Sequence, residues 1–287
     1  LASRGFDSLD DDFSVEGHEL LKRLKGVLDQ AREAKDDADR LLEAYHDAQE
    51  AKEEAQLLLR LGYLGLDAAA AADQLYWTAC REVLSGLLAA RLEDPPPEQL
   101  ELESQLAEVY LGNFSVFQSM LDHWAIGQVF PIMPLDRLGE VPTRKAVLVD
   151  LTCDSDGKVA EYVTALDNPR LLPVHELKAG EPYHLGVFLM GAYQDILGDA
   201  HNLFGRVPEV HVYADGEEPG NFWIEKILPG IRVQEMLAQV QYFPNDLSRR
   251  MSEFVRRKID RDELKPSEGM RILDEYTARF EDSTYAR

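Results

Sequence analysis

The sequence predicts an α+β protein in which an antiparallel helical bundle precedes a β domain of barrel or sandwich type with helices at its C-terminal end. Three observations lead to this prediction. Apolar residues recur at spacings of three and four from Leu20 to Ala48, as on the buried face of a helix. After residue 110, short apolar runs are separated by Gly, Pro and Asp, as strands are by turns. Helical spacing returns over about residues 230–287.

These textures divide the chain into residues 1–13 as a loop or tail, 14–108 as the bundle, and 109–287 as the β domain with added helices. The apolar seam predicts one long helix through Leu20 to Ala48. Glycines near Tyr63 end it, and Asp67 is expected to cap a second helix up to the prolines at 95–97. A third helix is expected over 98–110.

In the β domain, the expected strands are 111–117, 129–134, 146–151, 161–166, 183–190, 210–213 and 222–225. The expected helices are 194–203, 230–240, 247–259 and 268–280.

Composition excludes several classes of function. The chain has 287 residues, 45% of them hydrophobic, and a formal net charge of −23. Such a charge repels a phosphate backbone, so no nucleic-acid partner is expected. No apolar run reaches membrane-spanning length, so no membrane partner is expected. Two cysteines, Cys80 and Cys153, give no disulfide framework, so a cytoplasmic location is expected. The acidity promotes solubility or, alternatively, favours a cationic substrate.

The stretch 146–157 is the first candidate site. An apolar run stops at Cys153, Asp154 and Asp156, within turn-forming residues. Functional side chains commonly lie on such loops at strand ends. A buried packing thiol is the other interpretation of the cysteine, and the Asp-x-Asp-Gly fragment lacks the full spacing of a calcium loop.

A second candidate is Gly191-Ala192-Tyr193, between an apolar strand and a helix. Free N–H groups at a helix start and a tyrosine hydroxyl suit a phosphate. A core tyrosine beside a turn is the alternative. The histidines show no metal-ligand spacing; they are at positions 18, 46, 123, 175, 184, 201 and 211.

Taken together, five segments resemble one family. They are Asn113 to Met120, Asp122-His123-Trp124, Cys153-Asp154-Ser155-Asp156-Gly157, Gly191 to Gly198, and His201 to Gly205. This series resembles the C-terminal half of the biosynthetic, pyridoxal-phosphate-dependent arginine decarboxylases, which belong to the alanine-racemase-like decarboxylases. The resemblance is dense from Tyr110 to Gly205 and looser in the flanking helices.

The resemblance implies a role for each matching residue. Cys153 would lie near the reacting carbon and guide its protonation, and Asp154, assisted by Asp156, would hold the guanidinium of L-arginine. Asp122 and His201 would line the same pocket, and Tyr193 with Gly191 would bind the cofactor phosphate. In this family the cysteine and acid reach into the partner's site across a head-to-tail dimer, so a homodimer or a dimer of dimers is expected.

The resemblance also implies what the chain lacks. The family's Schiff-base lysine belongs to an N-terminal (β/α)8 barrel, and nothing in this sequence resembles that barrel. We therefore expect the chain alone to be inactive and to need a barrel region or chain as partner. Because the sequence begins at Leu1 rather than Met, a fragment of the enzyme is favoured over one chain of a split enzyme. Magnesium is implied by family association only.

The expected function is thus conversion of L-arginine to agmatine and carbon dioxide, an entry to polyamine synthesis. Two alternatives stay open. In the first alternative, the chain is a non-catalytic assembly or regulatory module, which its apolar seam and the missing lysine would allow. In the second alternative, the enzyme is a decarboxylase whose substrate is lysine, ornithine or diaminopimelate.

Overall fold

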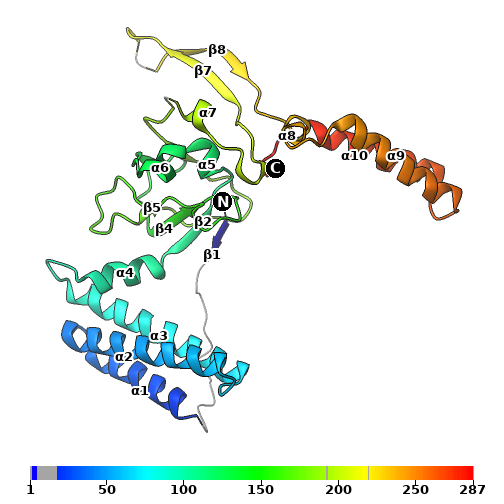
Figure 1. Ribbon diagram of the computed structural model, residues 1–287. Coiled ribbons are helices and arrows are strands. Elements are labelled where there is room, and N and C mark those ends of the chain that lie inside the picture. The colour runs from blue at the N-terminus through cyan, green and yellow to red at the C-terminus, as the bar shows by residue number, and fades with distance from the viewer. Residues whose placement is uncertain (1, 5–17, 192, 219, 287) are drawn as a thin grey trace.

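The computed structural model describes residues 2–4, 18–191, 193–218 and 220–286. The helical bundle lies at one end, small sheets lie in the middle, and a hairpin and a pair of C-terminal helices project from the sheets (Figure 1). The α+β class and the N-terminal bundle are confirmed. The predicted loop or tail over 1–13 lies mostly outside the described residues, but its described part, Ala2–Arg4, is a short strand, β1.

The bundle consists of α1 (Glu19–Ala34), α2 (Ala38–Arg60), α3 (Leu66–Ala90) and α4 (Pro97–Gln105). Its core is made largely of Leu and Ala, which let the helices approach closely. The predicted seam is buried, and its members include Leu24, Ala31, Leu41, Tyr45 and Ala48.

The single long helix predicted over this seam is wrong, because the chain turns back at Lys35. Lys35 has φ 55°, and Asp37 caps α2 by accepting the Arg40 N–H. Gly86 of α3 accommodates this turn, since a Cβ there would lie 2.3 Å from the Lys35 carbonyl oxygen. Apolar spacing continues through the turn, so the sequence pattern alone did not reveal it. The cap of α3 is also corrected, from Asp67 to Gly65.

The main sheet has the strand order β1-β2-β4-β5, formed by Ala2–Arg4, Glu108–Leu111, Arg144–Val149 and Leu172–Val174. Strand β2 pairs with β4 in parallel, and the other two pairings are antiparallel. A second, two-stranded sheet joins β3 (Ile132–Pro134) to β6 (Leu185–Val187). A common apolar core includes Tyr110, Val116, Met120, Leu148, Tyr162 and Val174.

The described strands do not form a closed barrel. The main sheet ends at β1 and β5 without closing, and most of its strands are only three or four residues long. The strand predicted over 161–166 is absent from the described structure. The strand predicted over 111–117 is also corrected: β2 ends at Leu111, and Ser115 then caps the short helix α5 (Val116–Ser119).

Helix α6 (Leu121–Ile126) follows α5 directly. The helix predicted over 194–203 is divided into α7 (Gln194–Leu197) and the 3₁₀ turn η1 (His201–Leu203). The division occurs at Gly198, where a Cβ would lie 2.5 Å from the carbonyl oxygen of Gln118. Segment 194–203 therefore packs closely on α5.

The hairpin of β7 (Glu209–Ala214) and β8 (Phe222–Leu228) exposes side chains on both faces, in contrast to the half-buried pattern expected from its alternation. The predicted C-terminal helices are confirmed as α8 (Val233–Gln239), α9 (Pro244–Asp260) and α10 (Pro266–Ala278), followed by the turn η2 (Arg279–Glu281). The described helices include none that is long and apolar enough to cross a bilayer.

Candidate active site

The loop that follows β4 is organised around a buried carboxylate, Asp150. Its Oδ2 accepts the Val116 N–H at 2.8 Å, and its Oδ1 accepts both the N–H and the hydroxyl of Thr152, at 2.8 and 2.6 Å. A carboxylate buried in this way needs several donors to replace water. Asp150 therefore ties the loop to the start of α5.

Gly157 closes the same loop. The Asp150 N–H donates to the Gly157 carbonyl at 2.8 Å, and the Gly157 N–H donates to the Asp154 carbonyl at 3.1 Å. A Cβ on Gly157 would lie 2.2 Å from Oδ1 of Asp150. The glycine is thus required by the close approach of the carboxylate.

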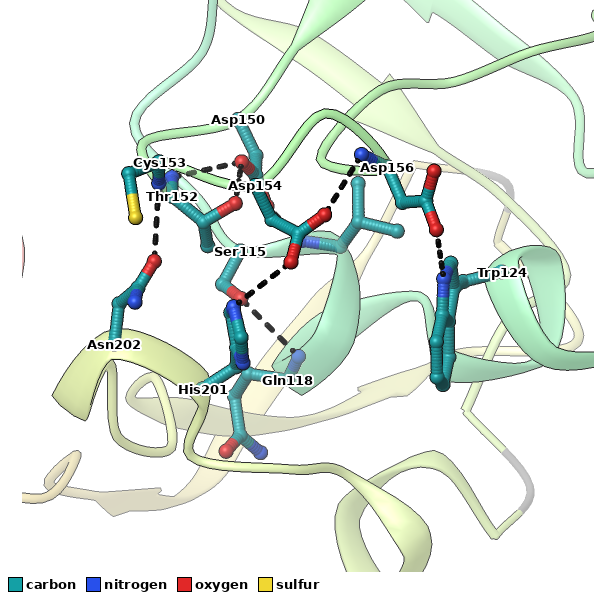
Figure 2. Close-up of polar contacts among 11 residues, drawn as sticks. Ser115, Gln118, Trp124, Asp150, Thr152, Cys153, Asp154, Asp156, His201 and Asn202 are labelled. Carbon is teal, nitrogen blue, oxygen red and sulfur yellow. Dashed lines mark hydrogen bonds and ion pairs between the residues drawn. The ribbon is translucent and has the colours of Figure 1, made fainter.

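The tip of the loop presents Cys153 and Asp154 beside the turn η1 (Figure 2). The Cys153 N–H donates to Oδ1 of Asn202 at 3.0 Å, and the cysteine is exposed. Oδ2 of Asp154 lies 3.5 Å from Nε2 of His201, with the two side chains 40% and 33% exposed. The interpretation of Cys153 as a buried packing thiol is therefore wrong. Both the thiol and the carboxylate are accessible to a small molecule.

Asp156 lies at the other end of the loop. Its N–H donates to Oδ1 of Asp154 at 3.0 Å, and its Oδ2 accepts the indole N–H of Trp124 at 3.3 Å. Phe117 of α5 joins the two ends, because its ring centroid is 5.1 Å from that of Trp124 and 4.5 Å from that of His201. The Phe117 ring therefore packs against both Trp124 and His201.

Helix α6 carries Asp122, which the structure connects to α7 through its main chain. The Asp122 N–H donates to Oε1 of the buried Gln194 at 3.3 Å. The neighbouring His123 is a structural residue. It accepts the Ala160 N–H at Nε2, 3.0 Å away, and its Nδ1 lies 2.8 Å from the Gln128 carbonyl oxygen that accepts its proton. No contact of the described residues joins the Asp122 carboxylate to Asp154 or Asp156.

Gly191 and Tyr193, the residues expected to bind a phosphate, stand just before α7. Gly191 has φ 140°, a conformation that favours glycine, and a Cβ there would meet open space. Tyr193 is 76% exposed, and its hydroxyl has no hydrogen-bond partner in the described part of the chain. The alternative of a core tyrosine is wrong. The exposed Tyr193 hydroxyl is a suitable donor for an anion.

Three residues that hold the candidate site in place were not predicted from the sequence: Asp150, Asn202 and Gln194. Asp150 ends an apolar run and was counted with the strand. Asn202 has φ 54°, a backbone conformation in which Asn is enriched, and its place beside the predicted His201 was the available indication. Within the described residues, no three His, Cys, Asp or Glu side chains form a group that could hold a metal ion.

Two regions of the chain match known domain families. Residues 14–101 match the arginine decarboxylase helical bundle domain, and residues 233–285 match the arginine decarboxylase C-terminal helical extension. The chain therefore contains two regions that are similar to domains of arginine decarboxylases.

Similar proteins extend this match to nearly the whole chain. The biosynthetic arginine decarboxylase of Bacteroides thetaiotaomicron is 42% identical over 276 residues, which are 96% of this chain and 42% of that protein. Biosynthetic arginine decarboxylase 1 of a Synechocystis species is 40% identical over 259 residues, or 87% of this chain and 36% of that protein. The chain thus spans less than half the length of these relatives.

The crystal structure of the biosynthetic arginine decarboxylase SpeA from Campylobacter jejuni superposes with a TM-score of 0.76 at 27% identity. The match covers 100% of this chain and 44% of that one. The predicted resemblance to the C-terminal half of biosynthetic arginine decarboxylases is confirmed.

Proposed function

We propose that this chain forms the C-terminal part of an arginine decarboxylase, a carboxy-lyase that converts L-arginine to agmatine and carbon dioxide for the synthesis of putrescine and spermidine. The observation that carries the proposal is the exposed pair Cys153 and Asp154. They stand on a loop fixed by a buried carboxylate and face His201 and Asn202. The relatives that match this chain are named for the same reaction.

The substrate's guanidinium would bind the acidic loop. Asp154 offers a carboxylate with 40% of its side chain exposed, and Asp156 offers a second one held by Trp124. A guanidinium is a planar fork of N–H donors that pairs with carboxylates. His201 and Asp122 would complete the pocket, and a net charge of −23 attracts a cationic substrate.

Pyridoxal phosphate, when bound, supplies the electron sink that makes loss of carbon dioxide from the α-carbon possible. In this proposal a lysine outside the chain holds it, while the Tyr193 hydroxyl and the Gly191 backbone bind its phosphate. Breaking the bond to the carboxylate leaves an electron pair on the α-carbon. The Cys153 Sγ–H would deliver a proton to that carbon and be reprotonated from solvent.

The site would be completed across two subunits. Cys153 and Asp154 would serve a cofactor held by the barrel of the partner, in a homodimer or a dimer of dimers. The isolated chain would then be inactive, and a barrel region would be its required partner. Both cysteines of the chain are free thiols, in keeping with a cytoplasmic location.

The complete protein tests the proposal directly. With L-arginine it should form agmatine, and with lysine, ornithine or diaminopimelate it should be much slower. Asp154→Ala should raise KM for arginine, because the guanidinium loses its carboxylate, and Cys153→Ala should lower kcat. Asp215→Ala is a matched control, since Asp215 likewise accepts the N–H of the residue two positions on but lies in the exposed hairpin.

Two results would contradict the proposal. If Cys153→Ala and Asp154→Ala left kcat and KM unchanged, the site would be wrongly assigned. If the complete protein showed neither activity nor cofactor absorbance, a non-catalytic assembly role would replace the enzyme.

A further inference from the structure

The last described residues of the chain return from α10 to the central sheets (Figure 1). There they contact the two segments that flank the candidate site. Asn113, just before α5, pairs with the main chain of Ala286: its Nδ2 donates to the Ala286 carbonyl at 2.9 Å, and its Oδ1 accepts the Ala286 N–H at 3.0 Å. This is a two-point contact across 173 residues of sequence.

Gly205, just after η1, is held by two consecutive side chains. The Gly205 N–H donates to the Thr284 hydroxyl at 3.0 Å, and the Tyr285 hydroxyl donates to the Gly205 carbonyl at 2.7 Å. The Tyr285 ring lies 5.3 Å from that of Phe204. Burial raises the pKa of Tyr285 to about 12, so its phenol keeps its proton at neutral pH.

The two segments held in this way are those that set the site. Asn113 leads into α5, whose Phe117 packs on His201. Gly205 follows Asn202, the residue that accepts the Cys153 N–H. Asn202 and Leu203 both have positive φ, at 54° and 65°. Non-glycine residues persist in that conformation only where their surroundings hold them.

We propose that Thr284 and Tyr285 are positioning residues for the active site: the C-terminal segment clamps Asn113 and Gly205, and thereby holds His201 and Asn202 against the loop of Cys153 and Asp154. The inference rests on the proposed function for its kinetic consequence. In this proposal, the role of the C-terminal helical extension is to return the chain to the active site. No residue of the clamp touches the substrate in this proposal.

The test uses the complete protein with conservative variants. Tyr285→Phe removes one hydroxyl and keeps the ring, and Thr284→Val removes another hydroxyl at equal volume. Each should lower kcat/KM for arginine roughly three- to tenfold, which is the range expected for the loss of one hydrogen bond. The decrease should come from a higher KM, because Asp154 and His201 lose their alignment. Thr284→Ser keeps the hydroxyl and should restore the parent value. Tyr276→Phe, on α10 and packed on Phe280, is the matched control and should have no effect.

Amide hydrogen exchange provides a readout that needs no activity. Tyr285→Phe and Thr284→Val should raise deuterium uptake in residues 150–157 and 201–205, and Tyr276→Phe should not. Unchanged uptake in 150–157 would overturn the clamp, and so would raised uptake with unchanged kcat/KM. If the parent protein failed to decarboxylate arginine while uptake rose as expected, the proposed function would fail and the clamping contact would stand.

Discussion

The main-chain N–H of Cys153 donates a hydrogen bond to the side-chain oxygen of Asn202 at 3.0 Å. The conformation of the loop tip therefore depends on a residue 49 positions further along the chain. Asn202 is accordingly part of the same unit as the loop, although it offers no group for the chemistry of decarboxylation.

Replacing Asn202 tests this relationship. Asn202→Gly retains a backbone suited to φ 54° and removes only the side-chain oxygen. We expect kcat/KM for arginine to fall up to about tenfold, because the loss of one hydrogen bond is worth about 0.5–1.5 kcal/mol. Steady-state kinetics of the complete protein measure this. Asn221→Gly, in the exposed hairpin turn, is the control, and equal kinetics for both variants would refute the dependence of the loop on Asn202.

Replacing Gly157 with any larger residue is predicted to destabilise the loop. In Gly157→Ala the new Cβ would lie 2.2 Å from Oδ1 of Asp150 and 2.4 Å from the Thr152 hydroxyl, so the loop must shift. Overpacking of this kind typically costs about 1–3 kcal/mol. Gly139→Ala is matched to it, because its Cβ would meet nothing within 4 Å. Denaturant unfolding and arginine turnover should both distinguish the two variants, and equal stabilities would contradict the geometry of the loop.

Asp150→Asn tests the buried carboxylate at constant volume. One of the two oxygens becomes an NH₂ group and must face a donor, either the Val116 N–H or the pair of donors from Thr152. Leaving a buried donor unpaired costs about 1–3 kcal/mol. We expect a lower unfolding midpoint and a higher KM for arginine. Asp215→Asn should leave both unchanged, and a fully stable, fully active Asp150→Asn protein would show that the charge is not needed.

The buried tyrosines predict a loss of stability in alkali. Burial raises the pKa of Tyr110 from 10.0 to about 12, and its hydroxyl donates to the His175 carbonyl at 2.8 Å. The neutral phenol is favoured in the folded state, so its contribution is complete below pH 10 and is lost as the pH rises from 10 through about 12. The free energy of unfolding should fall less steeply over this range in Tyr110→Phe than in the parent protein. Parallel curves would contradict the shift.

Much of the fold could be predicted from the sequence, because its apolar periodicity reflects burial directly. The seam residues are buried as expected, and the C-terminal helices lie where helical spacing placed them. The turn at Lys35 was missed because burial against α3 continues on both sides of it. Apolar periodicity indicates which face of a helix is buried. It does not reveal where the chain reverses direction between two helices whose buried faces follow the same spacing.

The exposed side chains of the candidate site could be predicted from the sequence, whereas the residues that hold them in place could not. Cys153, Asp154 and His201, which the resemblance assigns to one pocket, lie close together in the structure. The contacts that hold them come from Asp150, Asn202 and Tyr285, which are far apart in sequence or ordinary in composition. Contacts of this kind depend on tertiary packing, and they produce no periodic pattern in a single sequence.

We propose that Asp154 serves the active site of another subunit, and complementation between two inactive variants tests this proposal most directly. One full-length variant carries Asp154→Ala, and the other carries alanine in place of the lysine that holds the cofactor. If Asp154 acts across the dimer, the mixed dimer contains one site with both an intact lysine and an intact acid, and agmatine formation should return on co-expression. If the acid acts within its own subunit, both sites of the mixed dimer stay defective, and the absence of agmatine would contradict the account.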